Sequence, residues 1–431
     1  MADATHLAAR HTWERWAAVA GAVCSAAAAV ALLALPPEVQ PDTVSYIEHS
    51  PERAPLYPYL LDLFGAGAAA QVWLARVQAA SLVAASAFFA LRVGRALSLS
   101  VPWRHVLFLV LALPGLKFAA VLLAEPLGYT LVIVFWTFLA EEVLSGRDRR
   151  AWLCALCGLG LLLRPQFLFL PVFLGIFLLA RAACRRDRAS LVGLALLALV
   201  MAGAVVLRGA ENQARYGTFS TASSGGVHLL SSLLYIAQPE DAGAIADPAA
   251  RRLFLRSLEL AEAKSLTRRH WAMSRSHFDE SLVTLVFDVV RPGLGEVLPP
   301  GFPAAEAALR GDRLAMSAAT SLLAHMPGRF AALLARKVYD GQPFYYALVV
   351  ISGVVALAHG LAAGSRPAQL YALAALHSCL SYGVILFAGV YSLRYLLPAE
   401  AILLALAVAV GRALLGPPSG KAASAACGGS G

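Results

Sequence analysis

Residues 190–207 read SLVGLALLALVMAGAVVL, a run of 18 residues without a single charge. An α-helix of this length crosses the hydrocarbon core of a bilayer, which is about 30 Å thick. Arginines stand on both sides of the run, at Arg186 and Arg188 before it and at Arg208 after it. The stretch therefore predicts a membrane-spanning α-helix with charged residues at both of its ends.

The composition of the whole chain agrees with this reading. Hydrophobic residues make up 59% of the 431 residues and charged residues only 14%, and the mean hydropathy is +0.68. Soluble domains carry about 25% charged residues. A soluble multidomain enzyme is therefore excluded, and the fold class that we expect is an all-α polytopic membrane protein.

Apolar runs of comparable length recur along most of the chain. We expect about ten spans, since each run is long enough, alone or as half of a hairpin, to enter the hydrocarbon layer. The predicted spans lie near residues 16–36, 72–91, 105–123, 126–144, 152–164, 166–181, 190–207, 344–362, 368–388 and 397–415.

Arginines orient these spans. Clusters of arginine occur in alternate short loops, at 92–104, 147–150 and 181–188, and again at Arg366 and Arg412. Short loops rich in Lys and Arg stay on the cytoplasmic side. The pattern predicts a multi-pass protein of the inner (plasma) membrane with both termini in the cytoplasm.

The spans divide the chain into four parts. Residues 1–207 form an N-terminal transmembrane module that includes a first outer loop at 37–71. Residues 208–343 form a large outer, periplasmic loop region, in which arginines alternate with apolar residues as in amphipathic helices. The C-terminal transmembrane helices occupy 344–415, and the tail 416–431 has the composition of a disordered segment.

The dipeptide Arg164-Pro165 interrupts the apolar run 152–181. Basic clusters flank both ends of this run, so the chain must enter and leave on the same side of the membrane. Two short helices that meet at Arg164 satisfy this requirement, because Pro165 is tolerated at the first position of the second helix. A broken helix at membrane depth lines protein or a water-filled cavity, so we expect Arg164 to face such a cavity.

Two carboxylates stand at the outer ends of predicted spans. Asp42 follows the first span, and Glu125 precedes the fourth. Acidic residues at a membrane boundary are functional candidates by default. The alternative interpretation is structural: Asp42 would cap a helix N-terminus, and Glu125 would lie in a first helical turn, where the helix dipole favours it.

The first outer loop also contains tyrosines, a basic residue and several prolines. Tyr46 follows Asp42, and the stretch Arg53–Pro58 includes Tyr57. The tyrosines alone are typical of an interfacial aromatic belt. In the large outer loop, Lys337 is a candidate phosphate-binding residue, and the sequence Ser223-Ser224-Gly225-Gly226 is a weak candidate for an anion-binding backbone nest.

The order of these features resembles the GT-C superfamily of membrane glycosyltransferases, especially its protein O-mannosyltransferase-like and aminoarabinose-transferase-like branch. The order of the matching stretches over residues 15–415, rather than any one of them, carries the resemblance. The chain departs from the family pattern in having one acidic residue in the first outer loop, where many relatives have two, and His228 where Asn is usual. The matching stretches are Asp42 with Tyr46, Arg53–Pro58, Ala124–Leu127, Leu162–Pro171, Tyr216–Ser220 and Arg394–Pro398.

The resemblance implies a GT-C-like bundle that moves a sugar from a polyprenyl-phosphate carrier to an acceptor on the outer face of the membrane. Asp42 and Glu125 would be catalytic, with Asp42 accepting the proton of the acceptor. The basic residues would hold the leaving phosphate, although Arg394 and Arg164 could instead snorkel to lipid headgroups. The substrate-binding residues would be Tyr46, Arg53, Tyr57, Arg164, Lys337 and Arg394.

The expected partners are the lipid-linked sugar donor, a glycan, glycolipid or protein acceptor, and membrane lipid, with no nucleic acid. We predict no cofactor and no metal, because two carboxylates without a third ligand make a weak divalent-cation site. Two alternatives stay open. One is a lipid or sugar transporter or flippase, which would favour matching broken helices in two halves of the chain. The other is a non-catalytic subunit of a cell-envelope polysaccharide assembly.

Overall fold

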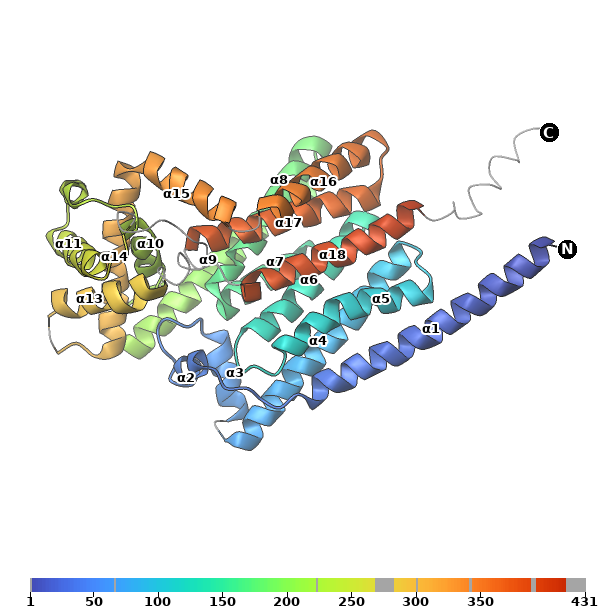
Figure 1. Ribbon diagram of the computed structural model, residues 1–431, viewed down its shortest axis with the longest axis horizontal. Coiled ribbons are helices and arrows are strands. Elements are labelled where there is room, and N and C mark those ends of the chain that lie inside the picture. The colour runs from blue at the N-terminus through green and yellow to red at the C-terminus, as the bar shows by residue number, and fades with distance from the viewer. Residues whose placement is uncertain are drawn as a thin grey trace.

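The computed structural model describes residues 2–65, 67–221, 224–267, 283–299, 301–340, 343–388 and 393–415. These residues form helices and connecting segments, and the only β-type pairing among them is an isolated bridge between Glu38 and Val121. Figure 1 shows a bundle of long helices with a group of shorter helices at one end. The predicted all-α class is confirmed for this part of the chain.

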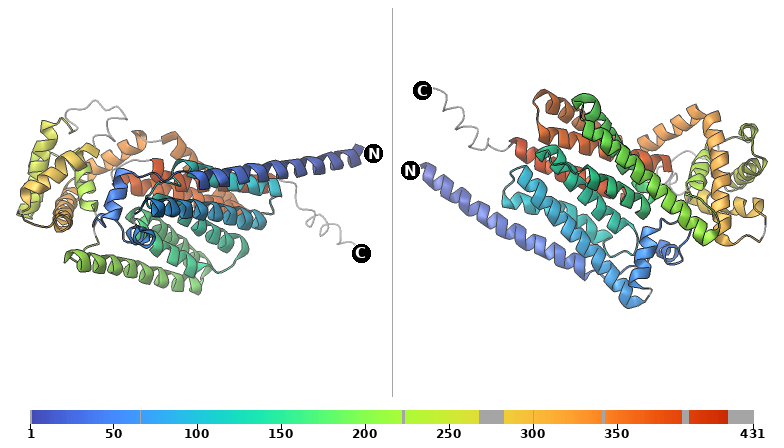
Figure 2. Two further views of the ribbon diagram at one scale, coloured as in Figure 1. Left: turned by 90° about the horizontal axis from the view of Figure 1, so that it is seen from below. Right: turned by 180° about the vertical axis from the view of Figure 1, so that it is seen from behind.

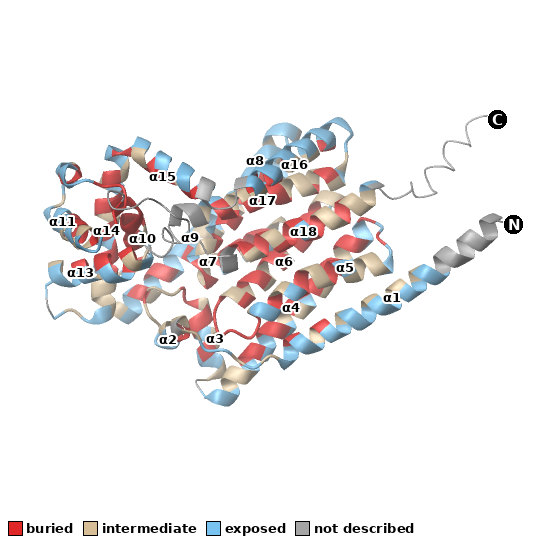
Figure 3. Ribbon diagram, viewed as in Figure 1, coloured by how far each residue is buried: buried red, intermediate tan, exposed pale blue. Residues whose placement is uncertain are grey.

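Seven helices of the bundle are long and apolar enough to cross a membrane. Many of their apolar side chains are exposed, as on α1, where pale blue predominates in the part of the helix that is coloured by burial in Figure 3. Such surfaces require a hydrocarbon environment, so the protein spans a membrane. The seven are α1 (Ala2–Ala34), α4 (Ala68–Ala96), α6 (Glu125–Ser145), α8 (Phe169–Arg185), α9 (Arg188–Tyr216), α16 (Pro343–Ala362) and α18 (Leu393–Leu415).

Three further helices lie in the same bundle: α5 (Val101–Ala112), α7 (Arg150–Leu163) and α17 (Arg366–Ala388). The helices α5 and α7 are only 12 and 14 residues long. Every predicted span therefore overlaps one helix, but only seven of the helices have the length and apolarity of a span by themselves. The count of ten spans stays a prediction.

The segment predicted as a span at 105–123 is not one helix. The helix α5 ends at Ala112 and is followed by a short 3-10 helix, η1 (Leu113–Lys117), and then by residues 118–124 without helix. Pro114 lacks the N–H that a continuing helix needs. Gly115 is packed so closely that a β-carbon there would lie 2.2 Å from Leu82. The Pro-Gly pair thus ends the helix and turns the chain toward α6.

The predicted break at Arg164-Pro165 is confirmed. The helix α7 ends at Leu163, Arg164 is extended, and a 3-10 turn, η2 (Pro165–Leu168), leads into α8. In contrast, no break separates the predicted span 190–207 from the outer region. The helix α9 continues to Tyr216 and ends where Gly217 adopts the left-handed conformation, as helix C-termini commonly do.

Most of the region predicted as a large outer loop folds into a helical unit with a core of its own, which we call the outer-loop domain. The predicted amphipathic character is visible in α11, which buries Leu253, Phe254 and Leu258 and exposes Arg251 and Arg252. The elements of the domain are α10 (Gly225–Leu234), η3 (Pro239–Ala244), α11 (Pro248–Ala263), η5 (Leu285–Val290), α13 (Arg291–Val297), α14 (Ala304–His325) and α15 (Pro327–Asp340). The predicted tail 416–431 lies outside the described residues.

Two short helices, α2 (Pro41–Ile47) and α3 (Leu56–Phe64), lie at the same end of the bundle as the outer-loop domain, as Figures 1 and 2 show. We call this end the domain end. The N-terminus of α1 and the C-terminal end of α18 lie at the opposite end, which we call the arginine-rich end. The sequence-predicted site residues come together at the domain end.

Candidate functional site

Two connecting segments that are far apart in the sequence are joined at the domain end. The backbone of Glu38 donates to Ala120 at 3.0 Å and accepts from Leu122 at 2.9 Å. The hydroxyl of Thr43 in α2 donates to the carbonyl of Leu122 at 3.0 Å. These bonds fix α2 beside the segment that leads into Glu125, so the two predicted carboxylates belong to one region.

Asp42 lies in the first turn of α2, and Arg53 holds its side chain. The guanidinium Nη2 of Arg53 is 2.8 Å from Asp42 Oδ1, and its Nε donates to Ser45 Oγ at 2.7 Å. Asp42 is not the helix cap, because Gln40 occupies that position. The side chain of Asp42 is 38% exposed, so a substrate can reach this carboxylate.

Glu125 and Arg164 form a second pair. Glu125 is the first residue of α6, as predicted, and its carboxylate contacts the guanidinium of Arg164 at the break between α7 and α8. Both side chains are about nine-tenths buried, with 10% and 9% of their surfaces exposed. A buried ion pair of this kind holds both partners in place, because removing either one leaves a charge without compensation.

The ring of Tyr46 lies beside the pair of Asp42 and Arg53. Arg53 stacks over this ring at 4.8 Å from its centroid. Burial raises the pKa of the Tyr46 hydroxyl above its ordinary value, while the charge of Arg164 opposes this shift, and the charges of Glu125, Arg53 and Asp42 have smaller effects. Arg53 links Asp42 to Tyr46, and the bonds of Glu38 and Thr43 to residues 120–122 bring the Glu125–Arg164 pair into the same region. We call Asp42, Tyr46, Arg53, Glu125 and Arg164 the acid–arginine cluster.

Tyr57 packs against this cluster from the interior of the protein and is not accessible to a substrate. Its ring meets that of Tyr46 edge to face at 5.0 Å, and its side chain is fully buried. Its hydroxyl donates to Gln78 Oε1 at 2.8 Å, and the Gln78 amide in turn donates to Val121 O at 3.0 Å. The predicted substrate-binding role of Tyr57 thus becomes a positioning role, because its hydroxyl is already committed inside the protein.

The outer-loop domain and α9 both contact the loop between α2 and α3. Arg291 Nη2 lies 2.8 and 2.7 Å from the two carboxylate oxygens of Glu52. At the end of α9, Arg208 donates to Pro51 O at 2.7 Å, and the Tyr216 hydroxyl donates to His49 O. The loop that carries Arg53 is therefore fixed from both the bundle and the domain.

His228 lies in α10 at this junction. Burial, together with the nearby charges of Arg291 and Arg53, lowers the pKa of its imidazole to about 4. The imidazole is therefore neutral at pH 7. The resemblance drew attention to His228 only as a departure from Asn, and nothing in the sequence indicated that it would lie beside Arg53.

Lys337 belongs to the domain. Its side chain is buried, and its Nζ is 3.5 Å from Ser232 Oγ, one helical turn after His228 in α10. The backbone of Arg394 lies at the start of α18, whereas its side chain lies outside the described part of the chain. The structure thus groups Asp42, Tyr46, Arg53, Glu125 and Arg164, with Tyr57 packed against Tyr46, and places Lys337 in α15, with its Nζ near Ser232 of α10.

The proposed anion nest at the start of α10 is already filled. The carboxylate of Asp312 in α14 accepts from the N–H of Val227 at 3.1 Å and is also hydrogen-bonded by Gly226 and Ser224. Burial raises the pKa of Asp312, while these backbone bonds oppose the shift. The described part of this stretch therefore holds a carboxylate of the protein itself and is not open to a substrate anion. Asp312 is distant in sequence, so no local pattern could have indicated it.

The described residues contain no group of three or more His, Cys, Asp or Glu side chains placed to hold a metal ion. Comparisons of the chain with protein-family models, with curated proteins and with solved structures found no match.

Proposed function

We propose that the protein is a membrane glycosyltransferase that moves a sugar from a polyprenyl-phosphate carrier to an acceptor at the outer face of the membrane. The observation that carries the proposal is the acid–arginine cluster: an accessible carboxylate paired with Arg53, and a buried pair of Glu125 with Arg164, at one end of a membrane-spanning bundle. The resemblance of the sequence to GT-C enzymes supports the same conclusion. In this proposal the domain end faces the periplasm, and both termini lie in the cytoplasm.

In the proposed reaction, Asp42 is the general base. Its carboxylate takes the proton of the acceptor hydroxyl as the acceptor oxygen bonds to the anomeric carbon. The bond between that carbon and the phosphate oxygen breaks at the same centre, and polyprenyl phosphate leaves with the electron pair. Asp42 is the better candidate of the two carboxylates, because its side chain is 38% exposed whereas that of Glu125 is 10% exposed.

The other members of the cluster hold the charged side chains in place. Arg53 orients Asp42 through its Nη2 and orients Ser45 through its Nε. Arg164 would stabilise the leaving phosphate, since a guanidinium offers several N–H groups in a planar fork. Glu125 then holds Arg164 in place and neutralises it while no substrate is bound. This changes the predicted role of Glu125 from catalytic to positioning.

The lipid portion of the donor would lie against the bundle, while the acceptor glycan, glycolipid or protein would approach from the outer-loop domain. A transporter or flippase is the competing function. Inverted-repeat transporters place broken helices in matching positions of two halves. Among the described residues the clear break at Arg164-Pro165 has no counterpart in α16, α17 or α18, which are each continuous. This favours the transferase.

The experiment compares purified wild-type protein with Asp42→Asn in lipid nanodiscs. Both are given a panel of polyprenyl-phosphate sugars and a membrane extract as the acceptor source, and release of free polyprenyl phosphate is measured by mass spectrometry. We expect Asp42→Asn to lose about 100-fold or more in turnover, the range for removal of a general base.

Asp62→Asn is the matched control, because Asp62 is an exposed acid of the same outer segment that pairs with His49. The control should keep wild-type turnover. Equal turnover in wild type and Asp42→Asn would overturn the role of Asp42. Movement of an unaltered lipid-linked sugar across liposomes, with no chemical change, would overturn the transferase function itself.

A further inference from the structure

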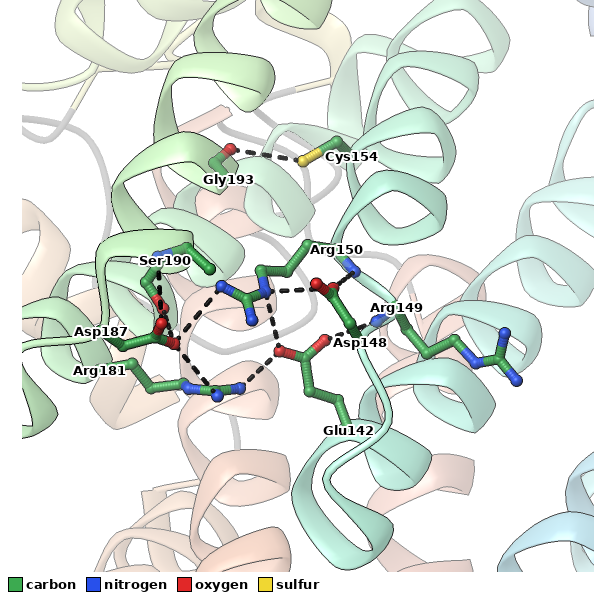
Figure 4. A network of polar contacts seen from close by, with 10 residues as sticks. Glu142, Asp148, Arg149, Arg150, Cys154, Arg181, Asp187, Ser190 and Gly193 are labelled. Atoms are coloured by element: carbon green, nitrogen blue, oxygen red, sulfur yellow. Dashed lines mark hydrogen bonds and ion pairs between the residues drawn. The ribbon is translucent and has the colours of Figure 1, made fainter.

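The arginine-rich end of the bundle contains a network of four paired arginines, which we call the inner arginines. They come from α4, from the start of α7 and the residue before it, and from α8, and they face carboxylates of α6, of the loop between α6 and α7, and of the turn between α8 and α9. Figure 4 shows Arg150 and Arg181 around Glu142 and Asp187, with the backbone of Arg149 beside Glu142. The inner arginines are Arg92, Arg149, Arg150 and Arg181, and the carboxylates are Glu141, Glu142, Asp148 and Asp187.

Each carboxylate of this network is already engaged. Glu142 lies 2.5 Å from Arg181 Nη1 and 3.5 Å from Arg150 Nε, and its other oxygen accepts the backbone N–H of Arg149 at 3.1 Å. Asp187 is shared between Arg150 and Arg181 and also accepts from the Ser190 hydroxyl at 2.8 Å. The four carboxylates of the network are therefore all paired with inner arginines.

A second set, which we call the outer arginines, surrounds this network. It consists of Arg95 at the end of α4, Arg147 in the loop between α6 and α7, and Arg186 and Arg188 between α8 and α9. All four side chains are exposed. None of the four lies within ion-pair distance of a carboxylate in the described part of the chain, because the nearby acids are bound to the inner arginines.

The outer arginines border a belt of exposed apolar side chains. Trp152 follows Arg147 by little more than one helical turn and is 59% exposed, and Leu191 and Val192, directly after Arg188, are 56% and 70% exposed. Apolar surface of this extent needs hydrocarbon. The guanidinium groups next to it therefore lie at the depth of the lipid headgroups, not free in bulk solution.

We propose that the outer arginines form a binding surface for anionic phospholipid headgroups. A guanidinium pairs with a phosphate through two parallel N–H bonds, and basic residues at the membrane surface attract anionic lipid. A soluble polyanion fits less well, because the same side chains are flanked by hydrocarbon-facing residues. The inner network gives this surface its strength, since it leaves no carboxylate to compete with lipid phosphate.

The test measures binding of phosphatidylglycerol and of phosphatidylcholine to delipidated full-length protein in detergent, by native mass spectrometry. The variant is Arg147→Gln with Arg188→Gln, which leaves Arg186 unchanged because its backbone is left-handed, with φ 50°. The matched control is Arg252→Gln with Arg313→Gln, two exposed arginines of the outer-loop domain. One arginine near an anionic surface contributes about fivefold to binding, so the variant should bind phosphatidylglycerol about 30-fold more weakly.

The control should bind like wild type, and phosphatidylcholine binding should be the same in all three proteins. Equal loss in the variant and the control, or no loss in the variant, would overturn the proposal. If the variant does not yield folded protein, a salt series on wild type decides the matter. Phosphatidylglycerol binding should then weaken between 0.1 and 0.5 M NaCl, whereas binding that ignores salt would refute an electrostatic surface. Neither outcome bears on the proposed transfer reaction.

Discussion

His228 provides a quantitative test of the junction between the outer-loop domain and the first outer segment. Burial and the charges of Arg291 and Arg53 lower the pKa of its imidazole to about 4. In the unfolded chain the same group has a pKa of about 6.5. The folded state therefore resists the protonation that the unfolded state accepts.

The sign of the effect follows from this difference. A base whose pKa is lowered by folding does not change the free energy of unfolding above about pH 6.5, because it is neutral in both the folded and the unfolded state. As the pH falls from 6.5 toward 4, the unfolded chain binds a proton that the folded protein does not, so the free energy of unfolding decreases. At about 1.36 kcal/mol per pKa unit, the difference between 6.5 and about 4 gives a total loss of about 3 kcal/mol, of which about 2 kcal/mol has been lost by pH 5.

The perturbation is His228→Gln, which keeps a polar side chain of similar size and removes the titration. The free energy of unfolding of the full chain in detergent micelles is measured by chemical denaturation at pH 8 and pH 5, for wild type and variant. Other titrating groups, such as Asp312, contribute equally to both proteins and cancel in the comparison. We expect wild type to lose about 2 kcal/mol more than the variant between the two pH values.

His359→Gln is the control, because this histidine is exposed near the end of α16, far from the junction. It should show the same pH dependence as wild type. If wild type and His228→Gln lose the same free energy between pH 8 and pH 5, His228 does not lie buried beside two arginines, and the described junction is wrong.

Three further substitutions test the packing around the site. Gly226→Ala would bring a β-carbon to 2.2 Å from the Asp312 carbonyl oxygen, so α10 and α14 must separate, and we expect a loss of about 1–3 kcal/mol; Gly203→Ala, with open space around it, is the control, and equal stability of the two variants would refute the close crossing. Tyr57→Phe removes the donor to the buried Gln78 and should lower the free energy of unfolding by about 1–3 kcal/mol, measured by chemical denaturation, whereas an unchanged value would show that Gln78 is reached by another donor. Arg53→Lys keeps the charge but cannot hold Asp42 and Ser45 together over the Tyr46 ring; kcat should fall while the thermal midpoint stays near that of wild type, and an unaltered kcat would remove Arg53 from the positioning role.

The sequence predicts the elements whose signal is local. The charge-free run 190–207 predicts the membrane-embedded part of α9, and Arg164-Pro165 predicts the break between α7 and α8. Pro114-Gly115 carried an equally local signal, but the apolar residues on both sides led to an expected span at 105–123. The Pro-Gly pair outweighs them, because it removes a hydrogen bond and allows the close approach to Leu82.

The candidate site is predicted only in part, because its contacts join segments that are distant in the sequence. Asp42 and Glu125 were identified from their positions at predicted span ends. Their partners were assigned to substrate phosphate, whereas in the structure Arg53 binds Asp42 and Arg164 binds Glu125. The pairing of Glu52 with Arg291, 239 residues later, depends on how the domain folds back. No periodicity or spacing reports a contact of that kind.

The most direct test of the proposed function is whether the purified wild-type protein changes a lipid-linked sugar chemically. Polyprenyl-phosphate sugars with an isotopic label on the sugar are incubated with the protein in nanodiscs and a membrane extract, and products are resolved by mass spectrometry. We predict free polyprenyl phosphate in equal amount to a newly labelled acceptor, both lost in Asp42→Asn. Binding or movement of every donor with neither product formed would contradict a glycosyltransferase.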